Sequence, residues 1–183
     1  MKVQFGLKNC HYAKATISGT SVTYATPVAI PGGVNLNLEA QGETTKFYAD
    51  DGVYFQTVTN TGYEGDLEVA KVPDQMLKDI FGYTEGTTSK VIADDANAEP
   101  AHFALLFEIS GDADSERYVF YDCVAGRPAI ASGTISGTKE PVTQSMTISA
   151  VPLANGVTMR RTAAGTPAQT KSGWFSSVFT STT

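Results

Sequence analysis

The chain has 183 residues, of which 42% are hydrophobic and 17% are charged, a composition typical of globular proteins and not of disordered ones. Its net charge of -6 argues against a role in gripping phosphate backbones, and its two cysteines exclude a disulfide-built scaffold. No apolar run approaches the roughly 20 residues of a membrane helix, so we expect a soluble protein made in a cytoplasm, with no membrane partner.

The first well-defined elements are a strand and a hairpin. Residues Val34–Ala40 alternate apolar and polar side chains without an error, which predicts a strand with one buried face. A hairpin is expected next, with Thr44–Ala49 and Val53–Thr59 as its arms and Asp50-Asp51-Gly52 as its turn. The polar face of the strand consists of Asn35, Asn37 and Glu39.

One helix is predicted, followed by an unusually apolar strand. Pro73–Phe81 begins with a proline, which a first helical turn tolerates, and Gly82 follows as a stop signal. Ala101–Ser110 is apolar on both faces, so we expect it at the centre of the fold and partly against a neighbouring subunit. The returning strand of this pair is expected at Arg117–Val124. The residues assigned to the interface here are Phe103, Leu105, Leu106 and Phe107.

The last regular strand is expected at Val142–Ala150, and a different kind of sequence follows it. The polar face of this strand consists of Thr143, Ser145, Thr147 and Ser149. The Asn155-Gly156 pair predicts a tight turn leading to Val157–Met159. After Arg161 the chain is small and polar apart from a short apolar cluster, so we divide it into a domain at 1–161 and a C-terminal arm or flexible tail at 162–183. The cluster consists of Trp174, Phe175, Val178 and Phe179.

These elements predict a mainly β protein, with two packed antiparallel sheets in a sandwich or barrel and one short α-helix. Strands and helices do not alternate along the chain, which rules out an all-parallel α/β fold.

Few residues of the sequence are candidates for catalysis or metal binding. The adjacent carboxylates Asp50-Asp51 and Asp94-Asp95 are interpreted as ordinary turn residues. A glycosidase also needs two acids, but they must face each other across the sugar, which neighbours in sequence seldom do. The two histidines, His11 and His102, have no partner histidine at helical spacing, and no glycine-rich phosphate loop is present. We therefore expect no catalytic residue, no cofactor, no metal and no enzymatic activity. Cys10 and Cys123 are expected to be small buried side chains, and whether they meet in space is left open.

Several strings of residues resemble the major tail proteins of long-tailed phages that infect Gram-positive bacteria. The resemblance spans roughly residues 1–159 and leaves the tail outside it. The strings are Val3-Gln4-Phe5-Gly6-Leu7-Lys8-Asn9-Cys10-His11-Tyr12-Ala13, Gly62-Tyr63-Glu64-Gly65-Asp66-Leu67-Glu68-Val69-Ala70, Glu99-Pro100, Phe103-Ala104-Leu105-Leu106-Phe107-Glu108, Gly111-Asp112, Arg117, Tyr121-Asp122-Cys123 and Arg127-Pro128.

The resemblance implies a tail tube protein, whose two sheets pack at a steep angle with a helix alongside. Such subunits form rings, usually hexameric, that stack into a hollow tube in the virion tail and are assembled in the bacterial host cytoplasm. The implied partners are further copies of the chain and, by resemblance, tape measure and tail-end proteins. DNA would pass through the lumen during ejection without specific binding. The ring order, the stacking offset and the host are not implied.

Within such a tube, the predicted elements have expected places. The two polar strand faces, at residues 35–39 and 143–149, would line the lumen, although an ordinary outer solvent face explains them equally well. The hairpin would reach an adjacent subunit or ring through Phe47, Tyr48, Tyr54 and Phe55. Trp174 and Phe175 would dock the arm in a groove on a neighbouring subunit, the alternative being a disordered exterior tail.

Two other classes remain open. A carbohydrate-binding or ligand-binding β-sandwich module would need an apolar pocket or aromatics gathered on one face. A hydrolase would need a convergent acid and base, which the sequence does not show.

Overall fold

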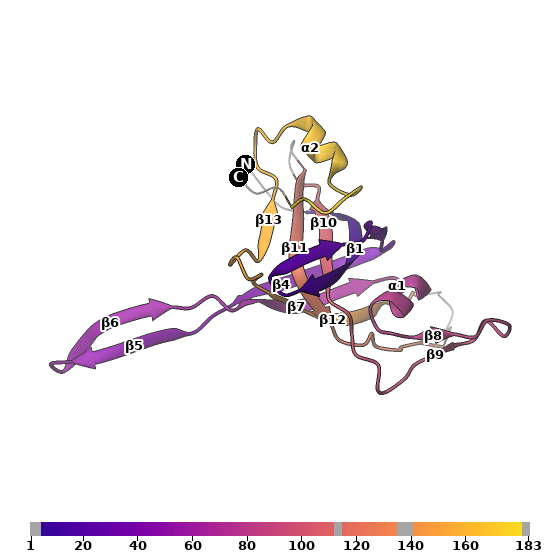
Figure 1. The fold of residues 1–183 in the computed structure, drawn as a ribbon, viewed down its shortest axis with the longest axis horizontal. Helices are drawn as coiled ribbons and strands as arrows, with labels where there is room; N and C mark the ends of the chain where they lie inside the picture. Colours follow the sequence, from indigo (N-terminus) through magenta and orange to yellow (C-terminus); the bar gives the residue numbers. More distant parts are fainter. Residues whose placement is uncertain (1–4, 112–114, 135–140, 181–183) are drawn as a thin grey trace.

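The computed structural model describes residues 5–111, 115–134 and 141–180, and these form a mainly β protein with two short helices (Figure 1). Every strand pair among these residues is antiparallel, as expected. The elements are β1 (Leu7–Ser18), β2 (Ser21–Tyr24), β3 (Val28–Ala29), β4 (Gly33–Gln41), β5 (Thr44–Ala49), β6 (Gly52–Val58), β7 (Gly62–Val69), α1 (Asp74–Asp79), β8 (Thr84–Glu85), β9 (Ile92–Ala93), β10 (Phe103–Ile109), β11 (Glu116–Ala125), β12 (Gln144–Val151), β13 (Met159–Arg161) and α2 (Ala168–Gly173).

The main sheet has nine strands, and its two halves face one another across the core. The strand order is β2-β1-β10-β11-β12-β7-β4, with β3 also paired to β1 and β13 also paired to β11. The first half of β11 pairs with β13 and its second half with β12, so the sheet divides along this strand. Gly33 of β4 is so close to β1 that an added Cβ would lie 3.0 Å from Sγ of Cys10. The expected two antiparallel layers are therefore halves of one twisted sheet, and in the described part of the chain they do not close into a barrel.

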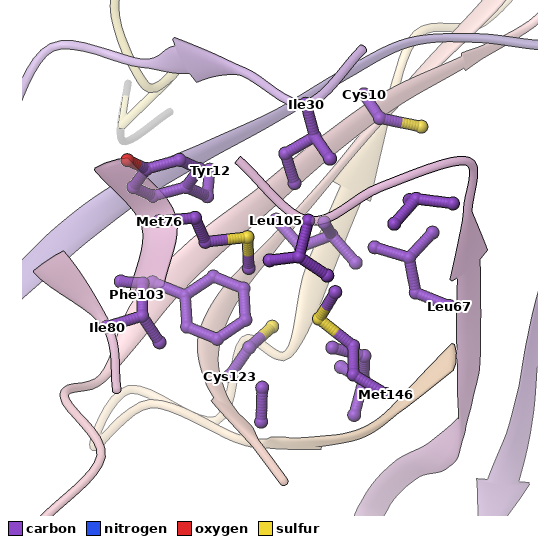
Figure 2. Close-up of a cluster of buried hydrophobic side chains, with 14 of the residues drawn as sticks. Cys10, Tyr12, Ile30, Leu67, Met76, Ile80, Phe103, Leu105, Cys123 and Met146 are labelled. Atoms are coloured by element: carbon purple, nitrogen blue, oxygen red, sulfur yellow. The ribbon is translucent and has the colours of Figure 1, made fainter. Parts of the chain in front are cut away.

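The main core lies between these two halves, and α1 covers one side of it. Figure 2 shows side chains of β1, β7, β10, β11 and β12 pointing together, with Met76 of α1 and its C-cap residue Ile80 packed against them. The hydroxyl of Tyr12 donates to Oδ2 of Asp79 at 2.9 Å, which ties β1 to the end of the helix. The helix follows Pro73 and ends before Gly82, whose φ of +71° favours glycine, so the predicted element is confirmed.

Both cysteines are free thiols in this core. They lie on β1 and β11, which β10 separates in the sheet. Burial raises the pKa of the Cys10 thiol to about 11 and also raises the pKa of Cys123.

A second, smaller apolar cluster covers the opposite face of β10 and β11. It joins Leu106, Val119 and Tyr121 of the sheet to Trp174, with the remaining apolar residues of the arm around them. Figure 1 shows α2 folded beside the strands β10, β11 and β13. No helix in the described ranges is long and apolar enough to cross a membrane.

Candidate functional site

The two predicted polar strand faces form one surface, because β7 lies between β4 and β12. On β7 the outward residues are Glu64, Asp66 and Glu68. Antiparallel pairing places each of them between one residue of β4 and one of β12. The three rows across the strands are Glu39-Glu64-Ser149, Asn37-Asp66-Thr147 and Asn35-Glu68-Ser145. We call these nine side chains the acidic face.

The acidic face carries four carboxylates and no cation. Its remaining members are amides and hydroxyls, which are neutral at any ordinary pH. Asn37 Nδ2 donates to Oε1 of Glu39 at 3.3 Å, and Thr143 at the margin donates its hydroxyl to Glu68. The β7 acids alternate with the buried Leu67 and Val69, which predicts that the acids point outward. Only the strand order of the folded sheet shows that they lie in the middle of the acidic face, between β4 and β12.

The backbones of β4 and β7 pack closely where Gly65 pairs with Leu38. A Cβ added to Gly65 would lie 1.8 Å from the carbonyl oxygen of Asn37, so a larger residue there would force the two strands apart. The three strands therefore present their polar side chains as one continuous sheet face.

The strands β5 and β6 form a hairpin that projects far from the rest of the chain (Figure 1). The predicted hairpin is confirmed, with Ala49 paired to Gly52 across its tip. Asp50 and Asp51 have φ values of +51° and +59°, which are the left-handed values of a type I′ turn. This turn matches the twist of the strands, and it places two carboxylates at the outermost point.

The hairpin exposes six large apolar side chains. Their exposed fractions run from 51% to 75%, and Phe47 and Tyr54 contact each other edge to face at 6.4 Å. In the part of the chain described here, β5 and β6 pair with each other and with no third strand. Monomeric proteins seldom expose so much apolar surface on one element without a partner. The six residues are Phe47, Tyr48, Val53, Tyr54, Phe55 and Val58.

The chain itself covers both faces of β10. Phe103, Leu105 and Phe107 lie in the main core, whereas Leu106 lies in the second cluster under Trp174. The apolar character of this strand is therefore explained within one subunit, without the neighbour that we expected to cover part of it.

The arm docks on its own chain. Trp174 is 3% exposed, and its indole N–H donates to the backbone carbonyl of Tyr118 at 3.2 Å. The ring of Phe175 stacks on His11 at 4.9 Å, with the guanidinium of Arg117 5.6 Å from its centre. Arg117 also donates to the carbonyl of Lys171. The groove that we expected on a neighbouring subunit is therefore present on the same subunit.

An apolar cleft of about 500 Å³ opens between β4 and the first half of β11. Its floor is aromatic, with Phe107 stacked between Tyr118 and Phe120 at centroid distances of 5.1 and 6.1 Å. Phe5 and Val34 at its mouth are 63% and 53% exposed. No sequence pattern indicates this cleft, because its walls come from strands far apart in the chain.

One histidine has a carboxylate partner that the sequence did not indicate. Nδ1 of His102 lies 2.5 Å from Oδ1 of Asp122, and the two side chains are 44% and 12% exposed. A hydrolase of the triad type also needs a nucleophile at the other ring nitrogen, and none of the described hydrogen bonds supplies one.

The other paired carboxylates have structural contacts. Asp95 accepts from the backbone N–H of Asn97 at 2.9 Å, and Asp94 pairs with Arg127 at 3.3 Å. Within the described ranges, no three His, Cys, Asp or Glu side chains gather as a metal site.

Among solved structures, comparison gives a distant likeness. No protein-family model and no curated protein matches the chain. A solved structure of the anti-feeding prophage cap, described as its tube terminating cap, aligns over 90% of this chain and 95% of its own, with 8% identity and a TM-score of 0.46. Such a score carries no functional assignment, so any assignment depends on the surfaces of this chain.

Proposed function

We propose that this protein is a structural subunit of a phage tail tube, which assembles with copies of itself into stacked rings. The observation that carries this proposal is the projecting hairpin, which exposes six apolar side chains and pairs with no other strand of the described chain. Burial of apolar surface is the main favourable term in protein association. A surface of this kind is explained when a neighbouring subunit covers it.

The acidic face supports a channel within such an assembly. Tubes that conduct DNA must not hold it, and binding strengthens with every cation that displaces counterions from phosphate. The four carboxylates repel a phosphate backbone, and the surrounding amides and hydroxyls add no cation that could displace its counterions. In this proposal the acidic face of each subunit lines the lumen, together with Thr143 at its margin.

The sequence resemblance supports the remaining parts of the proposal. By that resemblance the rings are hexameric, the partners are tape measure and tail-end proteins, and the tube is built in the bacterial cytoplasm and stays in the virion tail. The protein catalyses no reaction in this role and needs no cofactor.

Sedimentation and negative-stain electron microscopy of the purified protein test the proposal. We expect oligomers whose fraction rises with concentration, and rings or tubes with a central hole in the micrographs. A protein that stays monomeric at every accessible concentration would contradict the proposal.

A ligand-binding β module is the second candidate, and the apolar cleft favours it. Its volume of about 500 Å³ falls in the range of small-molecule sites. A binding module would stay monomeric and would bind an apolar dye such as ANS saturably in the cleft, whereas a tube protein oligomerises.

A further inference from the structure

The hairpin carries a large share of the surface that a stable protein interface needs. Aromatic side chains have accessible areas of about 150 to 250 Å². At the exposures observed, Phe47, Tyr48, Tyr54 and Phe55 together offer on the order of 500 Å². A standard interface buries about 800 Å² on each partner. Consecutive strand residues point to opposite faces, so a site that contacts both faces of the hairpin would supply most of the contact area.

The cleft has the chemistry to accept aromatic side chains. Its floor is built from Phe107, Tyr118 and Phe120, and Tyr63 contacts Phe120 edge to face at 5.1 Å. Aromatic rings gain from such offset and edge-to-face contacts beyond the area that they bury. Val34 and Phe5 add exposed apolar side chains at the mouth, where Asn35 and Asn37 also line the cleft.

The hairpin and the cleft lie on different parts of the same subunit. β4 contributes one wall of the cleft, and the hairpin follows β4 in the chain and extends away from the sheet (Figure 1). A hairpin cannot fold back into the cleft of its own chain while it points outward. A contact between two unlike surfaces of identical subunits is heterologous, and repeated contacts of this type produce rings or filaments.

We propose that the cleft of one subunit is the docking site for the β5–β6 hairpin of a second copy. This inference depends on the proposed self-assembly and adds the acceptor surface to it. The aromatic side chains of the incoming hairpin cover the floor of the cleft, and Val34 at the mouth contacts them.

Two variants separate the acceptor from the donor. In the acceptor variant, Val34→Arg places a long charged side chain at the mouth of the cleft, where the native side chain is already half exposed. In the donor variant, Asn-Gly replaces residues 47–55, which joins the paired residues Lys46 and Gln56 by a two-residue turn. Val142→Arg is the matched control, because Val142 is 45% exposed and lies outside the cleft.

Sedimentation velocity of the variants, alone and mixed, tests the proposal. We expect each of the first two variants to remain a folded monomer and Val142→Arg to assemble as the native chain does. An equal mixture of the acceptor and donor variants retains one intact hairpin and one intact cleft, so it should form a 1:1 heterodimer and nothing larger.

The remaining outcomes separate this inference from the proposed function. Normal assembly of Val34→Arg, or the absence of a heterodimer in the mixture, would show that the cleft is not the acceptor. If the native chain still forms rings in that case, the proposed self-assembly stands. A native chain that never oligomerises would overturn both. Thermal melting of each variant confirms that a loss of assembly is not a loss of folding.

Discussion

The indole N–H of Trp174 donates to the backbone carbonyl of Tyr118, 3.2 Å away, and so joins the C-terminal arm to the strand at which the sheet divides. Trp174 also stacks on Phe179 at 5.3 Å, and the hydroxyl of Tyr121 donates to the carbonyl of Phe179 at 2.5 Å. The arm is therefore part of the folded subunit, with one of its largest side chains buried.

Trp174→Ala should lower the free energy of unfolding by about 3 kcal/mol, because it leaves a cavity over Leu106 and removes a hydrogen bond. Chemical denaturation of the monomer measures this change. Ser176→Ala is the control, since Ser176 is exposed in the same arm and should unfold as the native chain does. Equal stability of the two variants would show that the arm does not contribute to the fold in solution.

Leu106→Asp should unfold the subunit, because the new carboxylate would be buried between β1, β11 and the arm. We expect a loss on the order of 4 kcal/mol or more. Leu106→Met keeps the volume and the apolar character, so it should cost less than about 1.5 kcal/mol. Circular dichroism during thermal melting compares the two, and a folded aspartate variant would contradict the observed packing.

Asp66→Lys should leave the subunit folded and its assembly intact, since Asp66 is exposed at the centre of the acidic face. A cation repeated around a ring would meet the phosphates of passing DNA, so ejection should slow, most strongly at low salt. Glu39→Lys should act in the same direction. Glu99→Lys makes the same charge change at an exposed position outside this face.

Virions carrying these variants report ejection through the fluorescence of a DNA-binding dye. If Asp66→Lys and Glu99→Lys eject DNA at the same rate from intact tails, the acidic face is an outer solvent surface.

Replacing residues 47–55 with Asn-Gly should change the melting temperature of the monomer by no more than about 2 °C. The hairpin pairs with no other described strand, so its removal takes away few stabilising contacts from the rest of the fold. Elongated tubes should disappear from micrographs of this variant. Full-length tubes would show that the hairpin is dispensable for assembly.

The two thiols should resist labelling at pH 8 in the folded protein. Burial raises the pKa of Cys10 from its ordinary 9.0 to about 11, which lowers its thiolate fraction at this pH by roughly 100-fold. The colour change of Ellman's reagent should be slow for the native chain and fast in guanidinium. A protonated Cys10 stabilises the fold below about pH 9, and that contribution should decline as the pH rises from 9 towards 11. Rapid labelling of the native protein would contradict the buried position.

The elements that sequence predicted best are those defined by local chemistry. Residues 34–40 alternate strictly and residues 145–150 do so after the polar Gln144, and both segments lie in strands with the expected faces, because a two-residue period indicates one buried side. The second strand begins at Gln144, two residues later than predicted. Asp50-Asp51-Gly52 located the hairpin because few residues tolerate two left-handed positions in succession. The short strand β2 was missed because four residues carry too little periodicity.

Relationships between distant elements could not be read from local patterns. The acidic face depends on β7 lying between β4 and β12, and strand order is decided by packing across the whole sheet. Similarly, the apolar cluster around Trp174 predicted that the arm docks, but the groove that we expected on a neighbouring subunit lies on the same chain. The cleft has no local signature, since its walls come from residues about 150 positions apart.

The isolation of the hairpin also bears on the timing of assembly. A two-stranded hairpin with no third strand is marginally stable in water, so its backbone gains full order only when another surface covers it. Ordering costs about 1 to 2 kcal/mol per residue, and the first few encounters between free subunits must offset it with few contacts. Growth on an existing ring meets many acceptor sites held in place together. Polymerisation should therefore begin after a lag, which a preformed ring abolishes, so that subunits remain dispersed until an initiating end is present.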